Sequence, residues 1–140
     1  MERATQTEHT SVHIATDDFV RFKQLWNACD GALSSRLAYP EVCAALAAAE
    51  RHPDLTASAA AAASDWELFW ESMRPVELSA DVERDAGSLA AAHQLGGADA
   101  IHLASARALG SIDLIVAVWD RRLHAGAVAV GFAVAPATLA

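Results

Sequence analysis

The chain has 140 residues, 54% of them hydrophobic and four of them tryptophan, which is enough to bury a core as a single domain over residues 1–140. Eighteen acids against ten bases give a formal net charge of −8, which argues against non-specific adhesion to nucleic acid. No apolar run reaches the roughly 20 residues of a membrane span, and the polar start is unlike a signal peptide, so we expect a cytoplasmic protein with no membrane association.

The first half of the chain alternates short apolar runs with helical patterns. These patterns predict, in order, a weak strand at 12–14, a helix at 19–28, a strand at 32–37, a helix at 40–51, and a helix from 56 or 58 to 73. Pro40 suits a first helical turn, and His52-Pro53 suits a helix end. The alanine run at 59–63 is typical of a helix interior.

The second half continues the alternation. Its patterns predict a short strand at 76–78, a helix begun by Ser79 and ended by Gly96-Gly97, a helix at 99–109, a strand at 112–119, a short helix at 121–125, and a last strand at 128–134. Strands that alternate with helices predict an α/β sandwich around a parallel sheet. Ligands of such sheets bind beyond the carboxyl ends of the strands.

Three acids stand where the predicted elements begin or end. Glu41 opens a helix, Asp99 opens another, and Asp120 follows the most apolar strand. If they converge, their oxygens favour Mg²⁺ or Mn²⁺ over zinc, which prefers histidine and cysteine. Each has a simpler interpretation: Asp99 as a helix N-cap, Glu41 as a partner of the helix dipole, and Asp120 as a turn residue.

Other side chains near these acids have two interpretations each. His102 is favoured as a histidine that hydrogen-bonds within the fold, with metal ligand or general base as the alternative. Trp66 and Trp70 are favoured as core or partner packing over the stacking of nucleotide bases. Three arginines could hold phosphates or simply be solvated: Arg36, Arg121 and Arg122. Ser34 and Ser35 lack the histidine–acid partners that a serine nucleophile needs.

Three segments carry a resemblance to a known family: SRLAYPEV at 35–42, ADAIHLA at 98–104 and WDRRL at 119–123. The chain resembles the PIN-domain ribonucleases, and more narrowly the VapC-type toxins of bacterial toxin–antitoxin pairs. The resemblance implies a three-layer α/β/α sandwich with a central parallel sheet. It also implies Mg²⁺- or Mn²⁺-dependent endonucleolytic cleavage of RNA, inhibition by a cognate antitoxin, and Glu41, Asp99 and Asp120 as catalytic metal-site positions.

The chain departs from this family pattern in two places. Residues 1–24 diverge, because the family's opening hydrophobic strand, which ends in an aspartate, is absent; Asp17 or Asp18 is the nearest substitute. Val118 stands where the family usually has threonine or serine, two residues before Asp120. The expected function is therefore a toxin endoribonuclease, and the alternatives are a degenerate PIN-fold module that only binds its antitoxin or partner, and a different metal phosphohydrolase. The family resemblance also allows a homodimer, with Phe69 and Trp70 as candidate interface residues.

Overall fold

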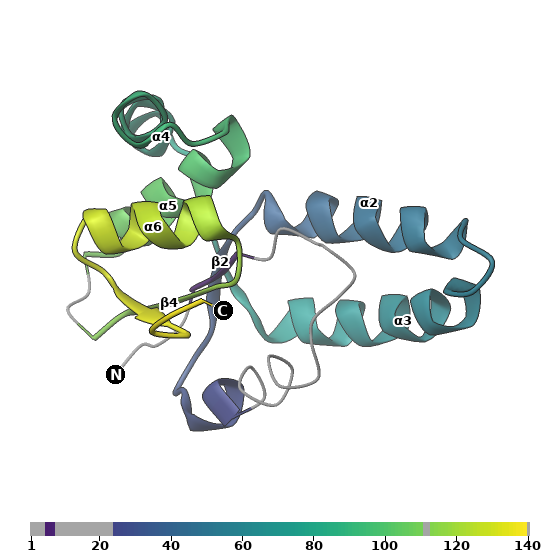
Figure 1. Cartoon of the computed structure of the whole chain (residues 1–140). Helices are drawn as coiled ribbons and strands as arrows, with labels where there is room; N and C mark the ends of the chain where they lie inside the picture. The colour runs from purple at the N-terminus through teal and green to yellow at the C-terminus, as the bar shows by residue number, and fades with distance from the viewer. Residues whose placement is uncertain (1–4, 8–23, 111–112, 140) are drawn as a thin grey trace.

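The computed structural model describes residues 5–7, 24–110 and 113–139 (Figure 1). Within that part of the chain, five short strands form one sheet in the order β3-β2-β1-β4-β5, and all neighbours are parallel. The strands are β1 (Thr5–Thr7), β2 (Leu33–Ser35), β3 (Arg74–Val76), β4 (Ile115–Val118) and β5 (Ala133–Ala135). The predicted parallel α/β sheet is confirmed.

The strand order decides which face of the sheet each helix covers. The chain passes from β1 to β2 to β3 in one direction, and then crosses back to β4 and β5 on the other side of β1. Because crossovers between parallel strands are right-handed, connections that run in opposite directions lie on opposite faces. Figure 1 shows α5 and α6 on one face and the helical residues 24–28 on the other, so the implied three-layer sandwich is confirmed.

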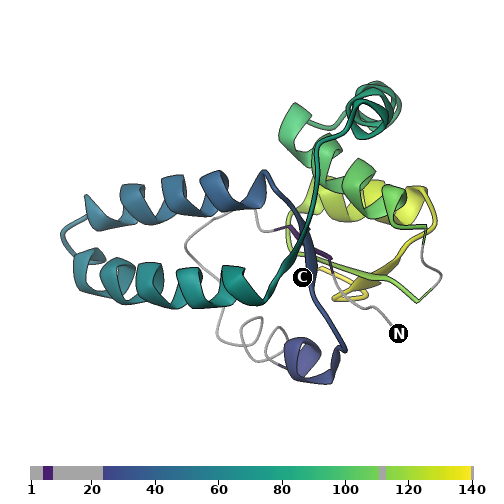
Figure 2. The same ribbon diagram turned by 180° about the vertical axis from the view of Figure 1, so that it is seen from behind.

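Two helices form a hairpin that projects from the sheet. α2 (Ala38–Glu50) and α3 (Thr56–Ser72) run side by side away from β2 and β3, as both views show (Figures 1 and 2). They confirm the two helices predicted in this part of the sequence. At the base of the hairpin, an aromatic cluster joins them to the helical residues 24–28; its members are Trp26, Tyr39, Trp66, Phe69 and Trp70.

The remaining helices pack over the other half of the molecule: α4 (Ala80–His93), α5 (Gly97–Ala108) and α6 (Arg121–Ala129). Ser79 caps α4 as predicted, accepting a hydrogen bond from the Val82 amide at 3.2 Å. α5 is the central helix and is buried along most of its length. Its apolar residues, together with β4, form much of the core; among them are Ala100, Leu103, Ala104, Ala106, Val116 and Val118.

The element boundaries correct several expectations. α4 ends at Gln94, which adopts a left-handed conformation, and Gly96 serves instead as the N-cap of α5. α6 extends to Ala129, so the last strand is only Ala133–Ala135 and not 128–134. Val130 packs against the core three residues after the buried Ala127 and seven after the buried Leu123, which is helical spacing, whereas Val128 is exposed.

The largest difference from the sequence predictions is the central strand of the sheet. β1 at Thr5–Thr7 pairs with both β2 and β4, with Thr7 opposite Val118. Neither its position nor its polar composition was expected from the sequence, since a central parallel strand usually reads as an apolar run. The strand predicted at 12–14 and the start of the helix predicted at 19–28 lie outside the described residues, as do Asp17 and Asp18.

Candidate active site

Two of the three acids lie at the carboxyl edge of the sheet, each after the end of a strand. Glu41 lies in the first turn of α2, just beyond the end of β2, and Asp120 follows β4. β2 and β4 are the two neighbours of β1, so both acids lie beside the centre of the sheet. Because all strands are parallel, their carboxyl ends share one edge, which is where α/β sheets bind ligands.

Asp120 has a structural task at this edge. It is the N-cap of α6, and its Oδ1 accepts a hydrogen bond from the Leu123 amide at 2.9 Å. The capping bond leaves the carboxylate's second oxygen with capacity to accept further bonds. Val118, two residues earlier, is fully buried in β4 and packs in the core. The expectation of a turn residue is thus refined to a helix cap.

Asp99 is not the N-cap that its simpler interpretation required. Gly96 holds that position, and Asp99 lies inside the first turn of α5. The residue is only 7% exposed. A carboxylate in a first helical turn is favoured by the helix dipole, but burial of an acid is costly unless charges or hydrogen bonds compensate it. Burial at the N-terminus of the central helix is therefore consistent with a functional carboxylate.

A hydrogen bond joins α2 to α5 across 61 residues of sequence. His102 Nε2 lies 2.6 Å from Glu41 Oε2, and the side chains of the two residues are 2% and 22% exposed. His102 is one turn beyond Asp99, so the two residues share a face of α5. The expectation that His102 hydrogen-bonds within the fold is confirmed. Glu41 was not predicted as the partner of His102. The sequence signal at His102 was its position three residues after Asp99 on the same helix.

The chemistry of the three acids suits a hard divalent cation. Glu41, Asp99 and Asp120 offer only carboxylate oxygens, the ligands that Mg²⁺ and Mn²⁺ prefer. Over the residues that the structure describes, however, no three histidine, cysteine, aspartate or glutamate side chains form a group that could hold a metal ion. The structure brings Glu41 and His102 together, and His102 lies one helical turn from Asp99 on α5. The three-acid site stays a prediction.

Of the three candidate phosphate-binding arginines, Arg36 is engaged elsewhere. Its Nε donates to Glu77 Oε1 at 2.7 Å. This hydrogen bond and the opposite charge raise the pKa of Arg36, and the same hydrogen bond lowers the pKa of Glu77. Both side chains are exposed, so the pair contributes little to stability. Arg121 and Arg122 open α6 directly after Asp120 and are exposed, so both lie beside one of the three candidate acids.

Two further predictions concern Ser34, Ser35 and the tryptophans. Ser34 and Ser35 are both buried on β2, with exposures of 0% and 1%, so neither hydroxyl faces solvent.

Trp66 and Trp70 pack on each other with ring centroids 5.5 Å apart, and Trp70 also contacts Tyr39. Packing within the fold therefore accounts for these tryptophans, as the favoured interpretation held.

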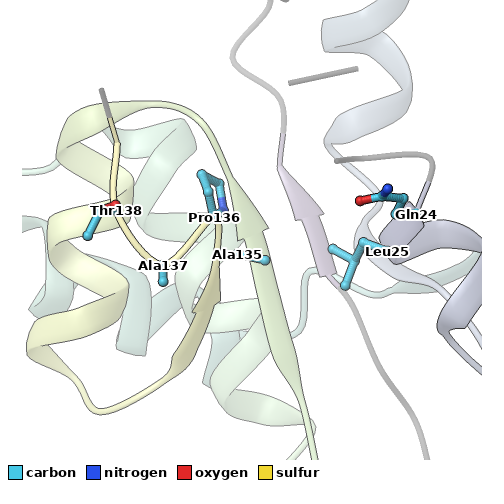
Figure 3. A pocket seen from close by; sticks show the side chains of 6 residues that line it. All are labelled: Gln24, Leu25, Ala135, Pro136, Ala137 and Thr138. Atoms are coloured by element: carbon cyan, nitrogen blue, oxygen red, sulfur yellow. The ribbon is translucent and has the colours of Figure 1, made fainter. Parts of the chain in front are cut away.

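The described residues form a surface cavity that none of the three acids lines. It has a volume of about 550 Å³ and opens between the helical residues 24–28 and the end of β5 (Figure 3). Its lining residues are uncharged: Gln24, Leu25, Ala135, Pro136, Ala137 and Thr138. No carboxylate or imidazole is among these described residues, so the cavity adds no candidate to the three acids and His102.

Comparison with known proteins gives the family. The PIN domain matches residues 10–127 of the chain. Two curated relatives, Ribonuclease VapC45 of Mycobacterium tuberculosis (strain CDC 1551 / Oshkosh) and Ribonuclease VapC49 of Mycobacterium tuberculosis (strain ATCC 25618 / H37Rv), are each 67% identical over 116 residues, which cover 82% of this chain and 81% of the relative. With its parallel α/β sheet and the acids at the ends of its elements, the chain belongs to the PIN-domain family, as a VapC-type member.

Proposed function

We propose that the chain is a Mg²⁺- or Mn²⁺-dependent endoribonuclease, the toxin of a toxin–antitoxin pair. The observation that carries the proposal is the position of Glu41 and Asp120 at the carboxyl edge of the sheet, with Glu41 hydrogen-bonded to His102, one helical turn after the buried Asp99. The VapC ribonucleases, at 67% identity, support the same activity and RNA as the substrate class.

Each acid has a defined part in this proposal. Glu41, Asp99 and Asp120 would hold the cation, which supplies Lewis-acid chemistry that activates water and stabilises the leaving oxygen. Glu41 and Asp120 are placed by the starts of α2 and α6, and Asp99 by the buried N-terminus of α5. Arg121 and Arg122, next to Asp120, would attract the RNA phosphates to an otherwise acidic molecule.

Substitution of Asp99 tests the proposal. Asp99→Asn preserves side-chain volume but removes the negative charge, and we expect it to abolish Mn²⁺-dependent RNA cleavage and the growth arrest caused by expression. The measurement is cleavage of a structured RNA during a Mn²⁺ titration, with circular dichroism showing equal amounts of folded protein. Unchanged cleavage by the Asn variant would contradict the assignment of Asp99.

The same titration separates the enzyme from the two alternatives. A degenerate binding module would bind its cognate antitoxin yet show no metal-dependent cleavage of RNA by the wild-type chain. A different phosphohydrolase would cleave small phosphoesters instead. The binding module remains an alternative because the described residues form no group of three potential metal ligands.

A further inference from the structure

We infer that His102 is a positioning residue, which holds the Glu41 carboxylate in place for the divalent cation. The inference rests on the proposed function, because it assigns a task toward the cation that Glu41 is proposed to bind. It starts from the 2.6 Å contact between His102 Nε2 and Glu41 Oε2.

The direction of this hydrogen bond follows from the chemistry of the two groups. An ionised carboxylate only accepts hydrogen bonds, so a bond to ionised Glu41 requires the His102 tautomer that carries its proton on Nε2. His102 Nδ1 is buried and has no hydrogen-bond partner in the described part of the chain. A single donor aimed at a single carboxylate oxygen leaves the other oxygen, Oε1, for the cation. His102 therefore orients Glu41 without competing with it as a ligand.

Glu41 needs such a partner because of where it lies. It belongs to α2, which projects from the sheet as part of the hairpin, whereas His102 belongs to the buried central helix (Figure 1). The N-cap of α2, Leu37, makes no side-chain capping bond that would fix this first turn. His102 is 2% exposed and lies within α5. The bond thus ties the candidate ligand on the hairpin to the helix that carries Asp99.

The alternative is that His102 serves only to stabilise the fold. A hydrogen bond to a partly buried carboxylate contributes to stability in any case. The two roles differ in what they require of the side chain. Positioning requires a donor at the place of Nε2, since partners that hydrogen-bond a ligating carboxylate commonly change metal affinity when they are removed. Purely structural packing requires volume rather than a donor.

The test compares three variants at position 102 with one control on the same helix. His102→Gln places an amide donor where Nε2 lies, and His102→Met has similar length but no donor. His102→Asn keeps a polar side chain that stops short of Glu41, and it replaces the Met variant if that variant fails to fold. The control is Ser105→Ala, because Ser105 is equally buried on α5 and its hydroxyl bonds only the Ile101 carbonyl of its own helix.

The primary readout is Mn²⁺ affinity, measured by calorimetry on the full chain, with circular dichroism as the check of folding. We expect the Kd for Mn²⁺ to rise about 10- to 100-fold in His102→Met or His102→Asn. The Gln variant and the Ser105→Ala control should bind nearly as wild type does. RNA cleavage should follow the same order.

Three results would overturn the inference. Folded His102→Met or His102→Asn that binds Mn²⁺ as tightly as wild type would show that Glu41 needs no positioning, while leaving the proposed nuclease intact. Equal loss in the Gln and Met variants would show that the imidazole itself is required. A wild-type chain that neither binds Mn²⁺ nor cleaves RNA would overturn the proposed function, and the positioning role with it.

Discussion

At the scale of single residues, Asp120 combines a structural and a proposed catalytic task in one carboxylate. Oδ1 caps α6 through the Leu123 amide, which fixes the orientation of the group relative to the end of β4. A cap also holds a side chain in one rotamer, so a ligand that is a cap is already oriented before the cation arrives. The two tasks can be separated, because capping needs an oxygen whereas cation binding favours a negative charge.

Two substitutions of Asp120 make this separation. Asn remains a good N-cap, so Asp120→Asn should keep stability close to wild type, while Asp120→Ala should lose about 1 kcal/mol of unfolding free energy. Both should lose Mn²⁺-dependent RNA cleavage, because both lack the charge. Urea unfolding and the cleavage assay measure the two effects. Full cleavage by the Asn variant would mean that the cap is the whole role of Asp120.

At the scale of elements, the α2–α3 hairpin is held together by contacts of its own. The Tyr39 hydroxyl on α2 donates to Glu67 Oε1 on α3 at 2.7 Å, beside the stacked Trp66. This hydrogen bond is the main cause that raises the pKa of Tyr39 from 10.0 to about 12; desolvation, the negative charge of Glu67 and contact with Cys43 act in the same direction. Because Glu41 lies on α2, the hairpin's stability bears on the candidate site.

The pKa of Tyr39 predicts how pH affects this contact. A group whose pKa is raised by folding stabilises the fold fully below its unfolded pKa, and loses that contribution as pH rises through its folded pKa. The difference in stability between wild type and Tyr39→Phe should therefore be constant below pH 10 and vanish as pH passes about 12. Thermal unfolding of both proteins across this range measures it. A difference that persists unchanged above pH 12 would contradict the assigned hydrogen bond.

The packing of α6 on α5 depends on Gly126. A Cβ at this position would meet Leu95 Cδ1 at 3.3 Å and Leu103 Cδ2 at 3.5 Å. Gly126→Val should destabilise the chain by about 1–3 kcal/mol, because larger side chains in a filled core force their neighbours to move. Gly87 on α4 is the matched control: a Cβ there meets nothing within 4 Å. Gly87→Ala should stabilise by about 0.5–1 kcal/mol through helix propensity.

Urea unfolding of both glycine variants distinguishes these effects. The loss expected at Gly126 comes from the side chains that valine would meet there, and the gain expected at Gly87 comes from the helix propensity of alanine at a site with open space. A Gly126→Val variant as stable as wild type would show that Leu95 and Leu103 move aside freely. The interface between α5 and α6 would then be looser than the structure indicates.

At the scale of the whole molecule, the acidic balance bears on the proposed activity. With a formal charge of −8, the chain would repel RNA, and under the proposal a cation and two arginines would offset that charge locally. Over the described residues, no helix has the length and apolar character needed to cross a membrane.

The expected homodimer stays a prediction, and its two candidate residues, Phe69 and Trp70, both pack within the aromatic cluster of the same chain.

Cation binding should be visible as a change in global stability. A ligand that binds only the folded state stabilises it by about 2.7 kcal/mol at 100 times its Kd, which for a chain of this size raises the Tm by roughly 10 °C. We expect this shift with Mn²⁺ for the wild type and a much smaller one for Asp99→Asn. Differential scanning calorimetry with and without Mn²⁺ provides the measurement. A wild-type Tm that is unchanged by millimolar Mn²⁺ would contradict the proposed cation site.

The sequence predicted those parts of the fold whose signals are local. Ser79 and its following acids predicted the start of α4, the alanine run lay within α3, and the apolar run before Asp120 became β4. Boundaries failed where two local signals competed: Gly96-Gly97 resembled a helix end, yet Gln94 ends α4 and Gly96 begins α5. β1 was missed because Thr5–Thr7 carries no apolar pattern and is a strand through pairing with β2 and β4.

By itself, the sequence determined the family resemblance, the alternation of strands and helices, and the choice of three candidate acids, because motif spacing and hydrophobic periodicity are properties of neighbouring residues. Tertiary structure alone decided that β1 occupies the centre of the sheet, that Asp120 caps α6, and that His102 lies within hydrogen-bonding distance of Glu41. The physical reason is distance along the chain. A contact across 61 residues depends on how the sheet orders its strands and on which face α5 packs, and no local pattern encodes either.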